Sequence, residues 1–101
     1  MSDEYPTDEQ LKTVEQWDCI NGDIPRLISL IKELWWTPGW GFTYKKGRDH
    51  LTRKAVWKLE LHTGGWSGNE SIIGALQHNE FFWMRFWQRS DRGGHYYFQI
   101  E

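Results

Sequence analysis

The sequence of 101 residues is poor in cysteine, in proline and in long apolar segments. The single cysteine, Cys19, has no partner for an internal disulfide and cannot form a zinc site built on several thiolates. No run of about 18 apolar residues is present, and the acidic N-terminus is unlike the basic start of a signal peptide. We therefore expect one soluble, cytoplasmic domain over residues 1–101, with residues 1–6 as a flexible acidic N-terminus.

The sequence also lacks a large charge excess, since 12 basic and 14 acidic residues give a net charge of −2. A domain dedicated to duplex nucleic acid is normally strongly basic, so this balance argues against one. The charges are nevertheless segregated. Residues 1–18 carry six acidic residues against one lysine, whereas residues 45–58 carry six basic residues against one acidic residue. This basic segment is typical either of a solvated surface or of a rim that attracts an anionic ligand.

Hydrophobic periodicity in the first half predicts two helices and two strands. Thr7 and Gln10 have the spacing of a capping box, which starts a first helix that ends at residues 21–22. Apolar residues at helical spacing predict a second helix over about residues 24–36. The period then changes to two, which predicts strands over about residues 40–45 and, after a turn at 46–49, 50–63.

The second half predicts one helix and one hairpin. Ser67 and Glu70 fit a capping box for a short helix that ends near residues 78–79. Strands over residues 81–89 and 95–101 flank a glycine-containing turn. The resulting order, ααββαββ, indicates an α+β domain with a four-stranded, mostly antiparallel sheet and helices packed on one face.

What the sequence has in abundance is aromatic residues, with 8 Trp, 4 Tyr and 5 Phe. Alternation along the predicted strand 81–89 places Phe82, Met84 and Phe86 toward the helices, and tryptophans and cations on the opposite face. The residues expected there are Trp83, Arg85, Trp87, Arg89, His95, Tyr97 and Gln99, together with Lys58, Glu60 and His62. Aromatic planes stack on bases and arginine binds phosphate, so this face favours a nucleotide-like anionic ligand. The alternative is that the tryptophans pack on arginine stems or against a second copy of the chain.

Two glycine-containing loops add candidate ligand-binding residues. In residues 64–70, the start of a helix offers free N–H groups to an anion, with Trp66 and Ser67 beside it. The segment lacks the lysine of a P-loop, and in the simpler interpretation Ser67 only caps the helix. Arg92 and His95 flank the predicted hairpin turn and project toward the same sheet face, although Gly93-Gly94 also serves the turn itself.

Catalytic chemistry has one candidate set, formed by Glu60, His62 and His95. These residues would supply acid–base groups to a small hydrolase or nuclease, but no nucleophile or oxyanion site accompanies them. Histidine, cysteine and carboxylate residues do not occur at the spacing of metal ligands, so we expect neither a metal nor a cofactor.

Residues 63–100 contain distinctive motifs: GGWSGNE at 64–70, Phe82-Trp83, Trp87, and RGGHY at 92–96. In these motifs the chain resembles small uncharacterised proteins encoded by tailed phages and prophages. The resemblance implies a phage accessory protein, with a host-takeover or anti-defence role, in the cytoplasm of an infected bacterium. It implies no enzyme and transfers no catalytic residue.

Together these features favour a non-enzymatic binding module whose partner is a nucleotide-like small molecule or a host protein. A small hydrolase or nuclease and a pure protein–protein inhibitor are the alternatives. We also expect a homodimer, because Phe81, Trp83, Trp87 and Tyr97 on one sheet face would form an apolar patch larger than monomers usually expose.

Overall fold

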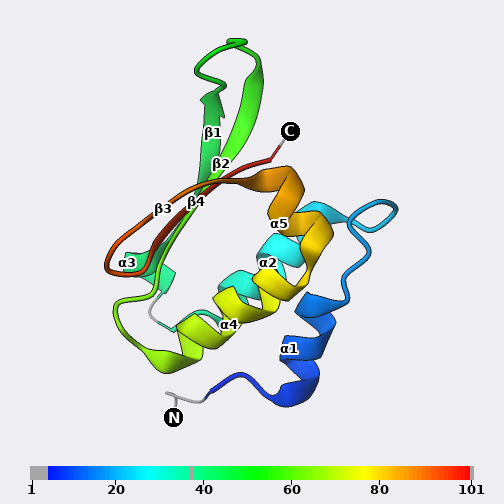
Figure 1. The fold of residues 1–101 in the computed structure, drawn as a ribbon, viewed down its shortest axis with the longest axis vertical. Coiled ribbons are helices and arrows are strands. Elements are labelled where there is room, and N and C mark those ends of the chain that lie inside the picture. The colour runs from blue at the N-terminus through cyan, green and yellow to red at the C-terminus, as the bar shows by residue number, and fades with distance from the viewer. Residues whose placement is uncertain (1–4, 37, 101) are drawn as a thin grey trace.

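A computed structural model describes residues 5–36 and 38–100, so most of the segment expected to be flexible, residues 1–4, lies outside the described residues. Four antiparallel strands form one sheet, and helices cover one of its faces (Figure 1). The strands are β1 (Phe42–Arg48), β2 (Ala55–His62), β3 (Trp87–Asp91) and β4 (His95–Ile100). Their order across the sheet is β1-β2-β4-β3, so β1 and β3 are the edge strands. The α+β class and the antiparallel sheet are confirmed.

The two N-terminal helices form for the local reasons that the sequence suggests. In α1 (Asp8–Glu15), the Thr7 hydroxyl accepts from the Gln10 N–H while the Gln10 side chain accepts from the Thr7 N–H, which completes the capping box. The helix ends at Glu15, earlier than expected. In α2 (Ile24–Leu34), Asp23 caps the first turn and Pro25 lies where its missing N–H costs nothing. No helix in the described part of the chain is long and apolar enough to cross a membrane.

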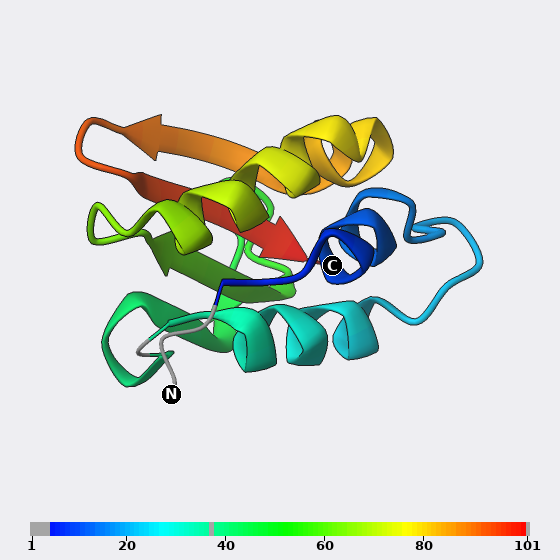
Figure 2. The same cartoon turned by 90° about the horizontal axis from the view of Figure 1, so that it is seen from below.

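The core lies between the sheet and the helix layer, in which α2 runs near the β1 side and α4 (Ser67–His78) near the β3–β4 side (Figure 2). It is formed by aliphatic residues of the two helices, by the helix-facing side chains of the central strands and by Phe82, which follows α4. The fully buried members include Leu27, Ile31, Leu59, Leu61, Ile72, Leu76, Phe82 and Phe98.

Two buried asparagines tie the ends of α4 to distant loops. Near its N-terminus, the Asn69 side chain accepts from the Trp36 N–H (2.9 Å) and donates to the Thr63 carbonyl (3.3 Å). At its C-terminus, the Asn79 amide donates to the Val14 and Trp17 carbonyls at 3.0 and 3.1 Å. Buried polar groups are stable only when they are hydrogen-bonded, so these contacts fix where the loops cross the helix layer.

The predicted strand over residues 81–89 is wrong, because residues 80–86 form a helix, α5 (Glu80–Phe86), and only the following residues form β3. The Asn79 side chain accepts from the Phe82 N–H and caps this helix. Phe82 and Phe86, four residues apart, lie on the buried side, whereas Met84 is 84% exposed. The apolar residues of this segment fit the periodicity of a helix as well as that of a strand. The asparagine cap and the burial of the two phenylalanines favour the helix.

Smaller differences affect the start and the tip of the first hairpin. Residues 38–41 form a single helical turn, α3 (Pro38–Gly41), so Trp40 precedes the strand instead of opening it. β1 continues through Arg48, and the turn lies at residues 49–54 instead of 46–49. The Asp49 carboxylate accepts from the Leu51 and Thr52 N–H groups at 2.8 and 2.7 Å, a local bonding pattern that favours a turn at this position.

Candidate functional site

The face of the sheet opposite the helices, here called the outer face, brings together side chains from three strands. Antiparallel pairing sets Glu60 opposite Tyr97 and His62 opposite His95. Arg89 of β3 lies opposite Tyr97 on its other side. Because directly opposed residues in a sheet project to the same side, the outer face combines two histidines, a glutamate, a tyrosine and an arginine.

The β3–β4 turn holds this register. Gly93 and Gly94 adopt φ values of 92° and 82°, a region that residues with a Cβ atom rarely occupy. A Cβ atom at position 94 would also collide with the Thr63 hydroxyl. The Thr63 N–H donates to the Gly94 carbonyl (2.9 Å), so the turn is attached to the end of β2. This attachment keeps His95 beside His62.

The two histidines are in direct contact, with 2.7 Å between their Nδ1 atoms. At this distance one nitrogen donates and the other accepts, and the tautomers of the two rings set the direction of this hydrogen bond. His62 Nε2 lies 3.7 Å from a Glu60 carboxylate oxygen. The His62 ring also packs edge-on against Tyr97, with 5.9 Å between ring centroids. Two hydrogen-bonded imidazoles beside a carboxylate have the elements of an acid–base site.

Arg89 stacks on the neighbouring aromatic ring, its guanidinium carbon 4.4 Å from the Tyr97 ring centroid. Its Nη2 atom also donates to an Asp91 carboxylate oxygen at 3.1 Å. The pKa of Arg89 is raised, first by its hydrogen bond with Tyr97 and then by the negative charge of Asp91. The cation is therefore held in one orientation while its side chain remains largely exposed.

A hollow of about 460 Å³ lies on the outer face across β2, β4 and β3. This volume is within the range of small-molecule sites, about 300–1,000 Å³. Charged and polar groups line most of it, and the two cations lie on different strands. The lining side chains include His50, Lys58, Glu60, Gln88, Arg89, Tyr97 and Gln99.

Positive charge is concentrated beside this hollow, because Lys45 of β1 lies directly opposite Lys58 of β2. Like charges in opposed positions of a sheet repel each other and destabilise the pair. Neither lysine forms an ion pair with another residue in the described ranges 5–36 and 38–100. An anion bound between them would remove this repulsion.

The outer face therefore retains only part of the predicted site. Arg89, His95 and Tyr97 lie on it, and Arg92 is exposed in the adjoining turn. Trp83 and Arg85 lie on α5, because that segment is a helix. Trp87 begins β3 opposite the buried Phe98 and stacks on Trp83, with 6.1 Å between ring centroids, so it faces the helix layer. The predicted ladder of alternating tryptophans and arginines does not exist.

The two candidates from the glycine-containing loop lie elsewhere. Trp66 packs against Tyr5 and Trp36, with centroid separations of 5.0 and 5.3 Å. The N-cap of α4 is Trp66 and not Ser67, and the Trp66 side chain makes no capping hydrogen bond. Ser67 is the first helical residue, and its hydroxyl contacts the Tyr5 hydroxyl at 2.7 Å. This loop anchors the N-terminal segment instead of completing the outer face.

Sequence reasoning placed Lys58, Glu60 and His62 on the outer face but did not include them among the ligand-binding residues. Alternation along β2 was the signal that could have added Lys58. Gln99 joins the lining of the hollow to the first hairpin, because its amide donates to Asp49, 50 positions away in the sequence. No local sequence pattern reveals this contact. That contact draws the tip of the first hairpin toward the hollow.

Within residues 5–36 and 38–100, no cluster of three or more His, Cys, Asp or Glu side chains has an arrangement that could hold a metal ion. Comparison of the chain with protein-family models, curated proteins and solved structures gave no match. The chemistry of the site therefore has to be inferred from its own geometry.

The apolar patch that suggested a homodimer is divided in the structure. Tyr97 lies on the outer face, whereas Phe81 and Trp83 belong to α5 and Trp87 stacks on that helix. Self-association stays a prediction. Sedimentation at micromolar concentration tests it against a monomer of 12.2 kDa.

Proposed function

We propose that the protein is a non-enzymatic binding module that takes a small, phosphate-bearing ligand of the nucleotide class on its outer face. The observation that carries this proposal is the hollow in which Lys58 and Arg89 lie on either side of the Tyr97 strand. As the resemblance of residues 63–100 implies, the setting proposed for this activity is an infected bacterial cell, where a phage accessory protein would capture a host component.

The phosphate groups bind between the cations of the hollow. Lys58 contributes a point charge and Arg89 a planar fork that matches phosphate geometry. Lys45, opposite Lys58, adds a third positive charge at the rim. Glu60, two residues along β2 from Lys58, also lines the hollow, and its carboxylate repels phosphate and so directs it toward the lysines.

A base or sugar has a stacking surface in the same hollow. One plane of the Arg89 guanidinium lies on Tyr97 and the other is open to solvent, and bases stack on arginine planes as well as on aromatic rings. The amide of Gln88, which is exposed, supplies hydrogen bonds to a base edge. The stacking platform is thus an arginine–tyrosine pair instead of the tryptophans that the sequence suggested.

Thermal-shift measurements and calorimetry with mono-, di- and cyclic nucleotides test this function. At least one class should raise the melting temperature, because a ligand that binds only the folded state stabilises it. Lys58→Gln and Arg89→Gln should each weaken binding about tenfold, whereas Lys12→Gln, on exposed α1, should leave it unchanged. Absence of any shift across the panel would contradict the proposal and favour a pure protein–protein inhibitor.

A second function, hydrolysis of a phosphodiester, is favoured by one specific observation, the 2.7 Å contact between His62 and His95 with Glu60 beside it. Glu60 lines the hollow of the outer face, and the paired His62 and His95 lie next to it along β2 and β4. Incubation of the bound nucleotide or of short RNA with the protein distinguishes the two functions. Product formation that disappears in His62→Ala and in His95→Ala supports hydrolysis, and binding without turnover supports the binding module.

A further inference from the structure

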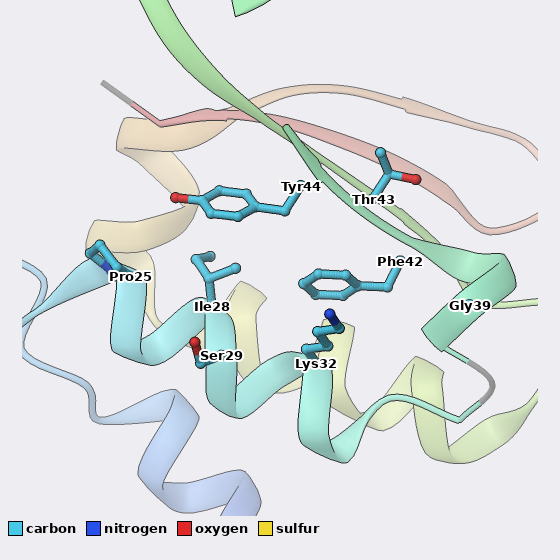
Figure 3. A pocket seen from close by; sticks show the side chains of 8 residues that line it. All are labelled: Pro25, Ile28, Ser29, Lys32, Gly39, Phe42, Thr43 and Tyr44. Atoms are coloured by element: carbon cyan, nitrogen blue, oxygen red, sulfur yellow. The ribbon is translucent and has the colours of Figure 1, made fainter. Parts of the chain in front are cut away.

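The edge strand β1 borders a trough that is separate from the outer face. A hollow of about 580 Å³ lies between β1 and α2, lined by Ile28, Ser29 and Lys32 of the helix and by Phe42 and Tyr44 of the strand (Figure 3). In Figure 3 both aromatic rings lie on the helix side of the strand, and Lys32 extends from the helix toward Phe42.

The trough continues along the strand. A second hollow of about 270 Å³ shares Pro25 and Tyr44 with the first and extends to Lys46 and Trp57. Tyr44 and Trp57 stack at 4.9 Å between ring centroids, which gives this part of the trough a flat aromatic wall. The two hollows together follow β1 from Phe42 to Lys46, which is the length of a short strand.

None of the strands in the described ranges pairs with β1 on the side away from β2, because β1 is the first strand in the sheet order. An edge strand presents a row of backbone N–H and C=O groups that an extended peptide can pair with. In such a pairing, alternate side chains of the added strand point to opposite faces. One set enters the trough beside Phe42 and Tyr44, and the other set lies beside Thr43 and Lys45.

The positive charge along the β1 edge favours an acidic peptide as its ligand. Lys45, Lys46 and Arg48 give β1 three cations and no acidic residue, and Lys32 adds a fourth cation from α2. Lys46 and Lys32 line the trough, while Lys45 lies on the outer side. A second copy of β1 would bring like charges together, so the lysines that prevent edge-to-edge pairing between copies also favour an acidic strand.

We propose that β1 binds an acidic, extended peptide segment of a partner protein, which adds to the sheet as a fifth strand in the trough between β1 and α2. Apolar residues of the segment contact Phe42 and Tyr44, and its carboxylates contact Lys45 on the outer side and Lys32 and Lys46 at the ends of the trough. The recognised pattern is an alternation of acidic and apolar residues. This site shares Lys45 with the rim of the outer face, whereas Lys32 and Lys46 line only the trough and Arg89 lines only the hollow of the outer face.

Blocked peptides of about ten residues, in which Glu alternates with Val, Ile or Phe, test the proposal by NMR titration of the full chain. Backbone shifts should concentrate in residues 42–46 and 25–32, and amide exchange in β1 should slow. Peptides with Lys in place of Glu should bind at least about tenfold more weakly. Replacing two central apolar residues with proline should abolish binding, because proline cannot donate to the ladder.

Charge reversal in the protein provides the matched variants. Lys32→Glu combined with Lys46→Glu should weaken binding of the acidic peptide about tenfold and improve binding of the lysine peptide. The melting temperature should fall only slightly, because both side chains are exposed and Lys46 makes one exposed cation–π contact, with Trp57. Lys12→Glu on α1 is the control for net charge. Arg89→Gln should leave peptide binding intact, so the outcome does not depend on whether the outer face binds a nucleotide.

Three results of the peptide titrations would overturn this assignment. The first is that none of the three acidic peptides binds at about 1 mM. The second is that acidic and basic peptides bind equally well. The third is that the backbone chemical-shift changes lie outside β1 and α2. A homodimer that pairs through β1 would overturn it as well, and sedimentation combined with exchange protection in residues 42–48 would reveal that dimer.

Discussion

Asn79 lies where α4 ends and α5 begins, and its side chain joins three segments of the chain. Its amide donates to the carbonyls of Val14 and Trp17, and its oxygen accepts from the Phe82 N–H. Asn79→Ala would leave two carbonyls and one helix N–H without these partners. We expect the free energy of unfolding to fall by roughly 2–4 kcal/mol, measured by urea denaturation.

Gln77→Ala, on the exposed side of α4, is the control for this substitution and should change stability by less than about 0.5 kcal/mol. A comparable loss in the two variants would mean that the asparagine does not hold the end of α1 against α4.

Asp49 controls the tip of the first hairpin through its charge. The pKa of this carboxyl is lowered from 3.8 to about 2, first by the Thr52 N–H, then by the Gln99 amide and the Leu51 N–H. Because the pKa is lower in the folded protein, the ionised group stabilises the fold fully above about pH 4, and this contribution is lost as the pH falls toward 2. Asp49→Asn should therefore be less stable than the wild type at pH 5.

Unfolding measured between about pH 5 and pH 2 tests the sign of this effect. The difference in stability between the wild type and Asp49→Asn should shrink steadily on acidification. A difference that stays constant over this range would show that the charge of Asp49 does not contribute.

At the scale of secondary-structure elements, α5 is the decisive segment, because its conformation determines which aromatic residues lie on the outer face. In a strand, Phe82, Met84 and Phe86 would share the buried face, whereas in the helix Met84 points to solvent. Phe82→Ala should cost about 3–5 kcal/mol, as expected for a fully buried phenylalanine. Met84→Lys should change stability by less than about 0.5 kcal/mol in urea denaturation. A large loss for Met84→Lys would instead support the strand.

The same segment shows what the sequence could and could not predict. Caps at Thr7 and Asp23, alternation along β2 and the glycines of the β3–β4 turn are local signals, and each led to an element that the structure contains. The apolar residues in 80–86 fit both helical and strand periodicity, so the sequence alone does not decide between them. The contacts of Asn79 with distant segments and with the Phe82 N–H favour the helix.

The candidate site likewise contains residues that local sequence patterns predict and residues that depend on tertiary structure. His95 and Tyr97 were predicted because they lie on a regular strand, where alternation fixes the face. Arg89 lies on the predicted face although the register of β3 shifts between Trp87 and Arg89, a shift that leaves Trp87 toward the helices and Arg89 on the outer face. Trp83 and Arg85 were assigned to the wrong face through the error in α5. The trough along β1 depends on how α2 lies across the edge of the sheet, which is a tertiary property that the helical pattern of residues 24–36 does not contain.

At the scale of the whole molecule, the two charged regions lie far apart. The molecule is 42 Å long, and the tip of the β1–β2 hairpin and the acidic helix α1 lie toward opposite ends of that axis (Figure 1). Charges at physiological ionic strength are screened over about 8 Å, so the acidic helix α1 does not neutralise the basic segment of residues 45–58, called the basic arm below. An anionic ligand or an acidic peptide therefore approaches a positive field, although the net charge of the chain is −2.

This segregation predicts a strong salt dependence of association. Stopped-flow measurement with the bound nucleotide or acidic peptide should show an association rate that falls several-fold between about 50 and about 300 mM salt, with a smaller change in the dissociation rate. In the variant Lys32→Glu with Lys46→Glu, the association rate of the acidic peptide should depend less steeply on salt concentration, because two of the charges that attract the peptide are reversed. Lys12→Glu alters the net charge at the other end of the molecule and should keep the wild-type slope. An association rate that does not respond to salt would mean that the basic arm is ordinary solvated surface with no part in capturing either ligand.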